Sequence, residues 1–390
     1  MHSFNKPSHI TITCSKRLAS YLHQEIILLN YKPASVFQTG VNINGTLNDC
    51  IRLNLNLRCA SQIYYSLKSF RCNNPDELYS IISAIQWENI IDSQGYFSVT
   101  STVNNPTVNN NLFVNVKIKD AIVDRFRDMV NERPDSGPLE DKTVIHLFWK
   151  DDMAEIFIDT SGQTLAKHNY RKIPGQAPML ESLASATILA SVWDKKSPFV
   201  NPMCGSGTLA IEAAMIATNR APGLFRDNYG FMHILGYEPS FFEKEKEVLN
   251  RQIIEIPELK IIATDYSEDA INISHINAGA AGVGDIIEFE VCNFEDTVFP
   301  ENGNGVIFFN PEYGERLGDE IELEETYARI GDFLKKKCRG YTGYIFTGNF
   351  NLAKKIGLKA KRRIEFYNGK IDCRLLEYEL YSGSREVKNT

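Results

Sequence analysis

The sequence contains no apolar run close to the roughly 18 residues that cross a bilayer. Its first residues, Met1–Pro7, lack the apolar core of a signal peptide. We therefore expect a soluble, cytoplasmic chain without a membrane partner. The 8 cysteines are spread over 390 residues, and neither a Cys-x-x-Cys pair nor a His/Cys set with metal-site spacing occurs. The sequence thus predicts reduced thiols and no bound metal.

The chain also lacks an excess of positive charge. Its formal net charge is -7, so the chain as a whole is not a basic nucleic-acid binder. Acidic totals do not exclude RNA binding, because a phosphate backbone responds to local patches. Basic residues gather late, at 335–339 and 354–363, and form either a solvated face or a phosphate-contacting rim. The length suits two domains rather than one.

Residues 1–165 mix short strands with helices, which is typical of an α+β domain. Strict alternation predicts a strand over 50–57, and Pro75 after Asn74 predicts a helix start. The other expected strands are 10–14, 96–103, 144–149 and 155–159. The expected helices are 18–29, 60–70, 75–85 and 119–133, the last with Ala121, Ile122, Phe126 and Met129 on its apolar face.

Residues 166–390 follow a different pattern. After a helix over 181–193, apolar strands and helices alternate, which predicts a parallel sheet covered on both faces. The expected strands are 198–201, 260–264, 286–291, 305–309 and 343–347. The expected helices between them are 208–218, 241–253, 268–279 and 323–337. Such sheets bind ligands beyond the carboxyl ends of their strands.

The first of these strands runs into a turn with two glycines. Gly205 and Gly207 let the backbone approach a ligand closely. Thr208 can cap the next helix, whose first N–H groups then face that ligand. An ordinary strand-to-helix turn is the alternative. A nicotinamide dinucleotide site is disfavoured, because Ala210 replaces the third glycine of Gly-x-Gly-x-x-Gly and Pro202 fits that turn poorly.

Two further residues belong to the same expected region. Cys204, inside the turn, is expected to be a packing residue rather than a nucleophile. The second strand ends in Asp265, whose carboxylate can accept two hydrogen bonds from ribose hydroxyls. Capping of the next helix is the alternative for Asp265, and Ser267 is the better cap.

The fourth strand ends in Asn310-Pro-Glu-Tyr313. An aryl amine is a poor nucleophile because its lone pair is delocalised into the ring. The Asn310 side-chain oxygen and the Pro311 carbonyl can accept from such an amine and orient its lone pair, while Tyr313 stacks on the base. A proline turn with a buried tyrosine is the alternative. Together with the glycine turn and Asp265, this motif predicts an S-adenosylmethionine enzyme that methylates a nitrogen of a base.

Longer segments around these motifs are similar to one family. Asn201–Ala217, Ala221–Gly223 and Asn310–Leu317 resemble the RlmL-type guanine-N2 RNA methyltransferases. Segments that resemble the THUMP domain and linker of the same proteins are 119–126, 133–134, 159–162 and 170–171. Ala177-Pro178 and Glu181 resemble the segment that precedes the first methyltransferase strand of these proteins. The resemblance implies a ferredoxin-like lead-in plus a THUMP RNA-binding domain over 1–165. It implies a Rossmann-like class I methyltransferase domain of the α/β class over 166–390. The implied cofactor is S-adenosylmethionine, and the implied reaction is N2-guanine methylation of large-subunit ribosomal RNA.

The motifs and the resemblance together assign the site residues. The catalytic residues are Asn310, Pro311 and Tyr313. The cofactor-binding residues are Pro202, Cys204, Gly205, Gly207, Thr208, Asp265, Asn293 and Asn310. The RNA-binding residues are Lys119, Arg125, Arg171, Lys354 and Lys355.

The sequence departs from the family pattern at three positions. Glu312 replaces the second proline of the family's Asn-Pro-Pro-Tyr, Asn293 stands where an acid near the adenine is usual, and Asn169 replaces a glycine. Because of Glu312, a non-catalytic THUMP-type RNA-binding protein is an alternative function. An amino-methylase acting on tRNA guanine or DNA adenine is also open, because Asn-Pro-x-Tyr serves that chemistry, and the THUMP-like half argues against DNA. A dehydrogenase is the remaining alternative.

Overall fold

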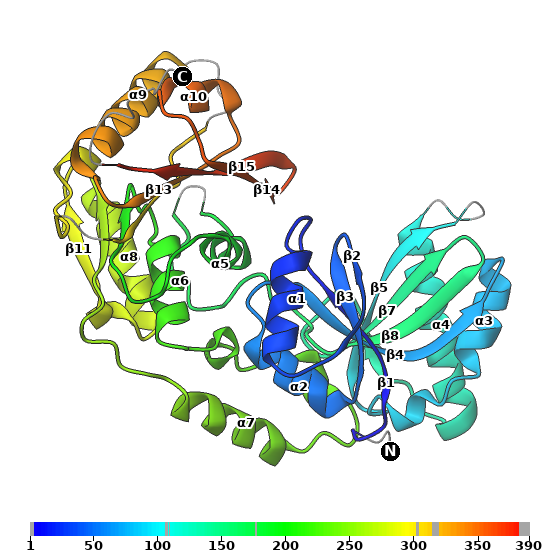
Figure 1. Ribbon diagram of the computed structural model, residues 1–390. Coiled ribbons are helices and arrows are strands. Elements are labelled where there is room, and N and C mark those ends of the chain that lie inside the picture. Colours follow the sequence, from blue (N-terminus) through cyan, green and yellow to red (C-terminus); the bar gives the residue numbers. More distant parts are fainter. Residues whose placement is uncertain are drawn as a thin grey trace. The chain divides into compact units, whose positions relative to one another are not determined.

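The computed structural model describes residues 4–105, 108, 110–175, 178–301, 304–313 and 320–381. The chain forms two compact units (Figure 1). The first comprises Met1–Ser15, Leu22–Leu165 and Pro222–Arg251, and the second comprises Lys16–Tyr21, Ala166–Ala221 and Gln252–Thr390. Ala177 and residues 314–317, which carry part of the resemblance, lie outside the described residues. Among the described helices, none is both long and apolar enough to cross a membrane.

The first unit is built on a sheet to which the described residues contribute eight strands. Their bounds are Ser8–Thr13 (β1), Pro33–Phe37 (β2), Gly40–Gly45 (β3), Gln62–Arg71 (β4), Tyr96–Asn104 (β5), Asp135–Ser136 (β6), Thr143–Lys150 (β7) and Met153–Asp159 (β8). The strand order is β2-β3-β1-β4-β8-β7-β5-β6. β5 runs parallel to β6 and β7, and the other neighbours are antiparallel.

Two elements of this unit are the reverse of the sequence prediction. The expected strand over 50–57 is helix α2 (Leu47–Asn56), and the expected helix over 60–70 is the central strand β4. α2 begins at a capping box, in which the side chains of Thr46 and Asp49 each bond the other residue's backbone N–H. The alternating apolar residues of α2 misled the prediction because this helix is buried on several sides.

The other helices of this part are closer to expectation. α1 (Ala19–Leu28) and α3 (Pro75–Ser83) form where predicted, and Asn74 caps α3. α4 (Asn111–Val130) packs against α3 and begins earlier than predicted, after an Asn110 cap. Three predicted apolar positions of α4 are buried, whereas Met129 in its last turn is 59% exposed, so the predicted apolar face ends before that turn.

The segment Pro222–Arg251 belongs to the first unit, although it follows the first strand and helix of the second unit in sequence. Its helix α7 (Pro239–Arg251) contacts α2, and Arg52 forms a bidentate pair with Glu245 at 2.8 and 3.0 Å. The prediction that this helix covers the second sheet is therefore wrong. Phe242 of α7 packs instead against aromatic rings of the first unit.

The described residues form a seven-stranded sheet in the second unit. The strands are Phe199–Pro202 (β9), Ile261–Asp265 (β10), Ile287–Val291 (β11), Val306–Phe309 (β12), Thr342–Thr347 (β13), Arg362–Asn368 (β14) and Ile371–Glu379 (β15), in the order β11-β10-β9-β12-β13-β15-β14. The strands from β11 to β13 are parallel, as predicted. β15 is antiparallel to both of its neighbours, so the sheet is mixed and the prediction missed the β14–β15 hairpin.

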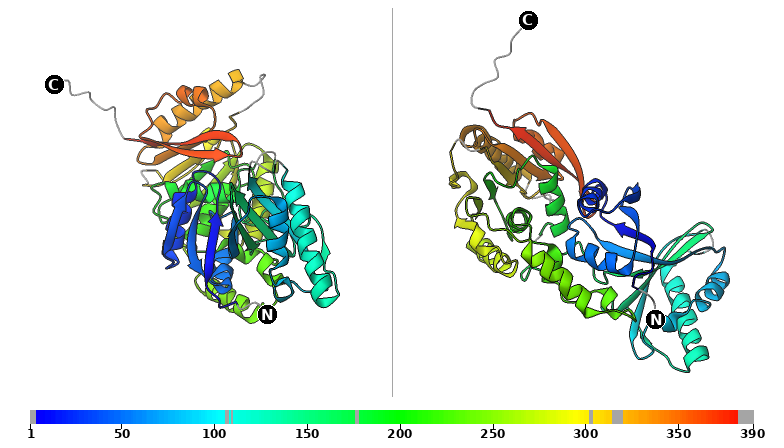
Figure 2. Two further views of the ribbon diagram at one scale, coloured as in Figure 1. Left: turned by 90° about the vertical axis from the view of Figure 1, so that its right-hand side faces the viewer. Right: turned by 60° about the horizontal axis from the view of Figure 1, so that its bottom comes forward.

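Helices cover both faces of this second sheet (Figures 1 and 2). On one face, α6 (Thr208–Ala217) contacts α5 (Glu181–Ala190) and α8 (Glu268–Ala280). On the other face, α9 (Glu320–Lys337) packs with α10 (Phe350–Lys355). All but α10 were expected near these positions.

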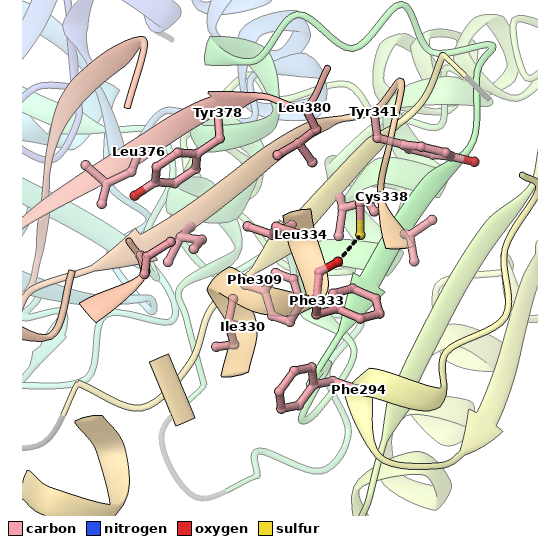
Figure 3. Packing of buried hydrophobic residues seen from close by; sticks show 14 of the residues in the cluster. Phe294, Phe309, Ile330, Phe333, Leu334, Cys338, Tyr341, Leu376, Tyr378 and Leu380 are labelled. Carbon is pink, nitrogen blue, oxygen red and sulfur yellow. Dashed lines mark hydrogen bonds between the residues drawn. The ribbon is translucent and has the colours of Figure 1, made fainter. Parts of the chain in front are cut away.

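The core beneath α9 fixes the strand that carries the Asn-Pro motif (Figure 3). Phe309 of β12 meets Phe294 and Phe333 edge to face, with ring centroids 5.9 and 6.0 Å apart. Such aromatic pairs contribute about 0.5–1.5 kcal/mol beyond the burial of their area. Because this packing holds Phe309, the backbone that leads into the next residue, Asn310, has a fixed position.

Candidate active site

In the second sheet, the order of the strands reverses at the central strand β9. β10 and β11 lie on one side of β9, and β12 and β13 lie on the other. The last paired residues of the β9–β12 ladder are Val200 and Ile307. Beyond them, the side-chain amide of Asn201 donates a hydrogen bond to the Phe308 carbonyl at 2.9 Å. The two tips that carry the motifs therefore lie side by side, at the kind of switch point where such sheets bind ligands.

The glycine loop after β9 turns through left-handed backbone. Its φ angles are 55° at Met203, 57° at Gly205 and 79° at Gly207. A Cβ on Gly207 would lie 3.0 Å from Ser274, whereas a Cβ on Gly205 would have no described atom within 4 Å. The backbone of Gly205 thus borders open space that a ligand can enter.

Three side chains hold this loop. Ser274 Oγ donates to the Gly205 carbonyl at 2.7 Å, and Asn277 Nδ2 donates to the Ser206 carbonyl at 3.3 Å. The Gly205 N–H donates to Asp265 Oδ2 at 3.0 Å. Because these side chains come from β10 and α8, the neighbouring βα unit sets the conformation of the loop.

The start of α6 differs from the sequence prediction. Gly207 is the N-cap, and no described side chain caps the helix, so the prediction that Thr208 does so is wrong. Thr208 Oγ1 instead accepts a hydrogen bond from Arg171 Nη2 at 2.9 Å. A glycine cap leaves the first N–H groups of a helix to other partners, and a polar ligand can bind them.

Arg171 is built into the interior of the second unit. Its guanidinium donates to the Met179 carbonyl at 2.7 Å and lies 3.6 Å from the Glu181 carboxylate, and its side chain is 11% exposed. Burial raises the pKa of Glu181, and the charge of Arg171 opposes that shift. The predicted RNA contact does not fit this geometry, because the cation is used between Thr208 and Glu181. The sequence around Tyr170-Arg171 carries no local signal for that partnership.

Asp265 lies at the tip of β10, and both of its carboxylate oxygens accept backbone hydrogen bonds. Oδ2 accepts from Gly205 and Oδ1 accepts from Ser267, each at 3.0 Å. Ser267 is the N-cap of α8, which confirms the preference for Ser267 over Asp265 in that role. Each carboxylate oxygen of Asp265 keeps a further lone pair, which a ribose hydroxyl can use.

Tyr266 and Asn293 stand near the ends of β10 and β11. Tyr266 is 77% exposed, and sequence reasoning missed it, although an aromatic residue directly after the strand-end carboxylate was a usable signal. Asn293 is exposed after β11, and its Oδ1 accepts from the Glu295 N–H at 3.2 Å and from Arg329 at 3.4 Å. Because that oxygen is used, the amide nitrogen of Asn293 is the group that can serve a purine.

Pro202 and Cys204 pack at the glycine turn. Pro202 is buried at the end of β9 and pairs with Thr264 of β10. Burial and, after it, the charge of Asp265 raise the pKa of the Cys204 thiol to about 12. Since the thiolate is the nucleophilic form, this cysteine is inert at neutral pH. All eight cysteines of the chain are free thiols.

Asn310 carries a buried side-chain oxygen, Oδ1, without a hydrogen-bond partner among the described residues. An unsatisfied buried acceptor costs about 1–3 kcal/mol, and such groups often await a ligand or water. Pro311 beside it is buried, and Glu312 is exposed. The oxygen of Asn310 is therefore available to a donor such as an amine.

Tyr313 completes the motif. Its ring is half-buried and lies edge-on to Phe346 at 6.3 Å, and its hydroxyl accepts from Asn368 Nδ2 at 2.7 Å. Burial raises the pKa of Tyr313 to about 12, so the phenol is neutral at physiological pH. Sequence reasoning missed Asn368, although Asn368-Gly369 between two alternating runs is a strong signal for a hairpin turn.

The predicted RNA-binding cations differ in how strongly they are engaged. Arg125 is 13% exposed and forms a bidentate pair with Glu88 at 2.6 and 2.7 Å, so its charge is used inside the first unit. Lys119 is half-buried and lies 2.9 Å from the neighbouring Asp120. Such partly exposed pairs contribute about 0–1 kcal/mol and can exchange for a phosphate.

The late basic run is largely balanced by acids. Lys355 pairs with Glu324 at 2.7 Å, and the run's other ion pairs are Lys361 with Glu379 and Arg362 with Glu377. Lys354 is exposed and donates to Asn351 at 3.1 Å. Lys354 and Lys355 thus remain candidates for phosphate contacts, on a rim less basic than its sequence indicates. The described His, Cys, Asp and Glu side chains form no group of three or more that could hold a metal ion.

Comparison with known proteins identifies the family. The RMKL-like methyltransferase domain matches residues 168–377, a range that contains every proposed cofactor-binding and catalytic residue. The chain belongs to the RMKL-like methyltransferase family. The RlmL ferredoxin-like domain matches residues 9–64, and the THUMP domain matches residues 72–159. The fold class predicted from the sequence is thus confirmed, with a Rossmann-like methyltransferase domain after two smaller domains.

Curated relatives of this RMKL-like chain are named ribosomal RNA large subunit methyltransferase K/L. The protein from Syntrophotalea carbinolica is 33% identical over 96% of this chain and 54% of the relative. The protein from Psychromonas ingrahamii is 35% identical over 95% of this chain and 50% of the relative. The chain spans about half the length of these relatives.

Solved structures are similar to nearly the whole RMKL-like chain. A putative methyltransferase complexed with SAH (S-adenosylhomocysteine) has a TM-score of 0.87 at 27% identity, over 97% of this chain and 100% of that chain. A predicted N6-adenine-specific DNA methylase from Listeria monocytogenes has a TM-score of 0.86 at 28% identity, over 96% and 97%. TrmN from Thermus thermophilus shares the fold, with a TM-score of 0.68 at 16% identity over 95% and 99%.

Proposed function

We propose that this chain is an S-adenosylmethionine-dependent RNA methyltransferase that modifies the N2 amine of a guanine in large-subunit ribosomal RNA. The observation that carries the proposal is the buried, unpaired Oδ1 of Asn310, for which no described residue supplies a donor. It follows β12, and β12 is the neighbour of the strand that ends in the glycine loop. An exocyclic amine brought to this place supplies the missing donor.

The surroundings of the glycine loop fit S-adenosylmethionine. Space beside Gly205 permits a close approach, and the uncapped start of α6 offers N–H groups to polar atoms. Asp265 has lone pairs for the ribose, Tyr266 offers a ring face and Asn293 an amide to the adenine. Bound there, the cofactor supplies an electrophilic methyl group on a sulfonium. The residues that shape the turn around it are Pro202, Cys204, Gly207 and Thr208.

The residues after β12 prepare the acceptor. Asn310 Oδ1 and the Pro311 carbonyl each accept a hydrogen from the amine, which draws the nitrogen toward tetrahedral geometry and orients its lone pair. Tyr313 stacks on the base and stays neutral, because burial raises its pKa to about 12. A flipped base costs a few kcal/mol of lost stacking, and this platform offsets part of that cost.

The THUMP match and the names of the K/L relatives support RNA as the substrate. We assign RNA binding to residues 1–165 and catalysis to residues 166–390. Lys119, Lys354 and Lys355 are the proposed phosphate contacts. DNA adenine is the second candidate acceptor, because the similar Listeria protein is described as a predicted N6-adenine-specific DNA methylase. Guanine in tRNA is the third.

A methyl-transfer assay tests the proposal. The protein is incubated with tritiated S-adenosylmethionine and, in separate reactions, with large-subunit ribosomal RNA from a strain in which this gene is deleted, with tRNA and with DNA. Mass spectrometry of the nucleosides identifies the product. We expect N2-methylguanosine in the ribosomal RNA reaction. N6-methyladenine in DNA would replace the proposed acceptor, and cofactor binding without transfer to any nucleic acid would contradict the enzymatic assignment.

A further inference from the structure

The phenol of Tyr313 is held by two residues that come from later parts of the second unit. Asn368 Nδ2, at the end of β14, donates to its hydroxyl at 2.7 Å. Gly348, directly after β13, lies against the ring, since a Cβ there would be 3.1 and 3.2 Å from ring atoms Cδ2 and Cε2. One end and one side of the ring are therefore fixed.

Asn368 is itself held firmly. It pairs with Ile371 across the two-residue turn of the β14–β15 hairpin, and Gly369 in that turn has a φ of 60°. Ile371 also packs on Gly348, where a Cβ would lie 2.6 Å from its Cγ2. The short turn and the packing of Ile371 therefore fix the backbone from which the Asn368 amide reaches Tyr313.

We propose that Asn368 is a positioning residue that sets the orientation of the Tyr313 ring, and through it the orientation of the target base. The inference rests on the proposed function, in which Tyr313 stacks on that base. Without the hydrogen bond, Tyr313 keeps its contacts with Gly348 and Phe346 but loses the anchor at its hydroxyl end. A base that stacks on a less ordered ring presents its amine out of line with the methyl group, so the rate falls more than RNA affinity does.

Variants at both ends of the hydrogen bond test this role. Asn368→Leu removes the donor at similar volume, and Tyr313→Phe removes the hydroxyl but keeps the ring. We expect each to lower kcat roughly 3- to 10-fold, as for the loss of one hydrogen bond. The KM for RNA and the calorimetric affinity for S-adenosylmethionine should change by less than about twofold. The double variant should be no slower than either single variant, because both remove the same interaction.

Two further variants separate positioning from general damage. Asn368→Asp can accept from the tyrosine hydroxyl, so it should recover most of the rate. Tyr341→Phe is the matched control, because it removes another tyrosine hydroxyl of this unit, bonded to the Pro300 carbonyl at 2.7 Å. It should lower the melting temperature and leave kcat unchanged.

The outcomes distinguish this inference from the proposed function. A rate for Asn368→Leu within twofold of the wild type, or additive losses in the double variant, overturns the positioning role alone. A loss of cofactor affinity as large as the loss of rate also overturns it, because the substitution then damages the unit. If the wild-type protein methylates none of the RNAs, the proposed function fails and this inference fails with it.

Discussion

The backbone N–H of Gly205 donates a hydrogen bond to the carboxylate of Asp265 at 3.0 Å, so one charged contact joins the tips of β9 and β10. The same carboxylate accepts from Ser267, at the start of α8. Asp265 therefore has two tasks in the proposed site. It holds the glycine loop in place, and it keeps lone pairs for the ribose of the cofactor.

We expect Asp265→Asn to weaken S-adenosylmethionine binding roughly 10- to 100-fold. An amide can accept from one of the two backbone N–H groups but turns a donor toward the other, and hydrogen bonds to charged groups contribute about 1.5–3 kcal/mol. Isothermal titration calorimetry measures the change. Asp269→Asn, at an exposed position in the first turn of α8, is the control and should bind normally. If the two variants bound S-adenosylmethionine equally well, Asp265 would not be part of the cofactor site.

We expect Asn310→Ala to lower the methyl-transfer rate by about 10²–10³, as for the loss of one positioned polar group in a preorganised site. The melting temperature should stay the same or rise, because the alanine removes a buried acceptor that is unsatisfied in the described structure. The transfer assay and thermal unfolding measure the two effects. A rate near that of the wild type, or a clear loss of stability, would argue for a structural role instead.

The first unit contains two buried groups whose titrations change stability with pH in opposite directions. Burial raises the pKa of Asp159 from 3.8 to about 7 and lowers the pKa of His146 from 6.5 to about 4. Between pH 4 and 6.5, the native state holds a proton on Asp159 that the unfolded state has lost, so this group makes stability fall as pH rises. Over the same window the unfolded state holds a proton on His146 that the native state lacks, so this group makes stability rise with pH.

We therefore expect the contributions of Asp159 and His146 to the unfolding free energy of the first unit to offset each other between pH 4.5 and 6. Relative to the wild type, Asp159→Asn should make the change of stability with pH more positive, and His146→Gln should make it more negative, each by up to about 1.4 kcal/mol per pH unit. Hydrogen exchange of the β7 and β8 amides in the full chain reports these slopes. Profiles in both variants that match the wild-type profile would show that neither group titrates as its burial indicates.

Substitutions of Arg125 and Lys119 should have different effects: the first should lower stability, and the second should weaken RNA binding. Arg125→Gln leaves Glu88 without its bidentate partner, so we expect a loss of about 1–3 kcal/mol in stability and an unchanged salt dependence of RNA binding. Lys119→Gln should leave stability unchanged and reduce the slope of log K against log salt by about one. Filter binding between 50 and 200 mM salt, together with thermal unfolding, measures both quantities. The reverse pattern would indicate that Arg125 contacts RNA.

Much of the second unit was predictable because buried parallel strands are short apolar runs separated by helices. β9 to β13, α6 and α8 form within a few residues of the predicted ranges. In the first unit, α2 and β4 were exchanged, because segments of about ten residues fit either periodicity when several of their sides are buried. The Thr46-x-x-Asp49 cap was the local signal that favoured a helix for α2.

The candidate site, too, could be predicted only in part from the sequence. Gly205, Asp265 and Asn310 could be named from the sequence, because tight turns and strand ends constrain residue type locally. The inward contact of Arg171 with Thr208 could not be predicted, and neither could the reach of Asn368 to Tyr313 across 55 residues. Both depend on how distant segments pack.

Local residue chemistry alone establishes where the chain turns and which groups stand at the ends of its strands. Glycine tolerates positive φ at Gly205 and Gly207, and asparagine with proline ends β12, wherever these segments lie. Long-range packing is what makes β9 and β12 neighbours, takes α7 out of the second unit and brings a late hairpin to Tyr313. These outcomes depend on burial and hydrogen bonding between segments far apart in the chain, whose free energies no local pattern contains.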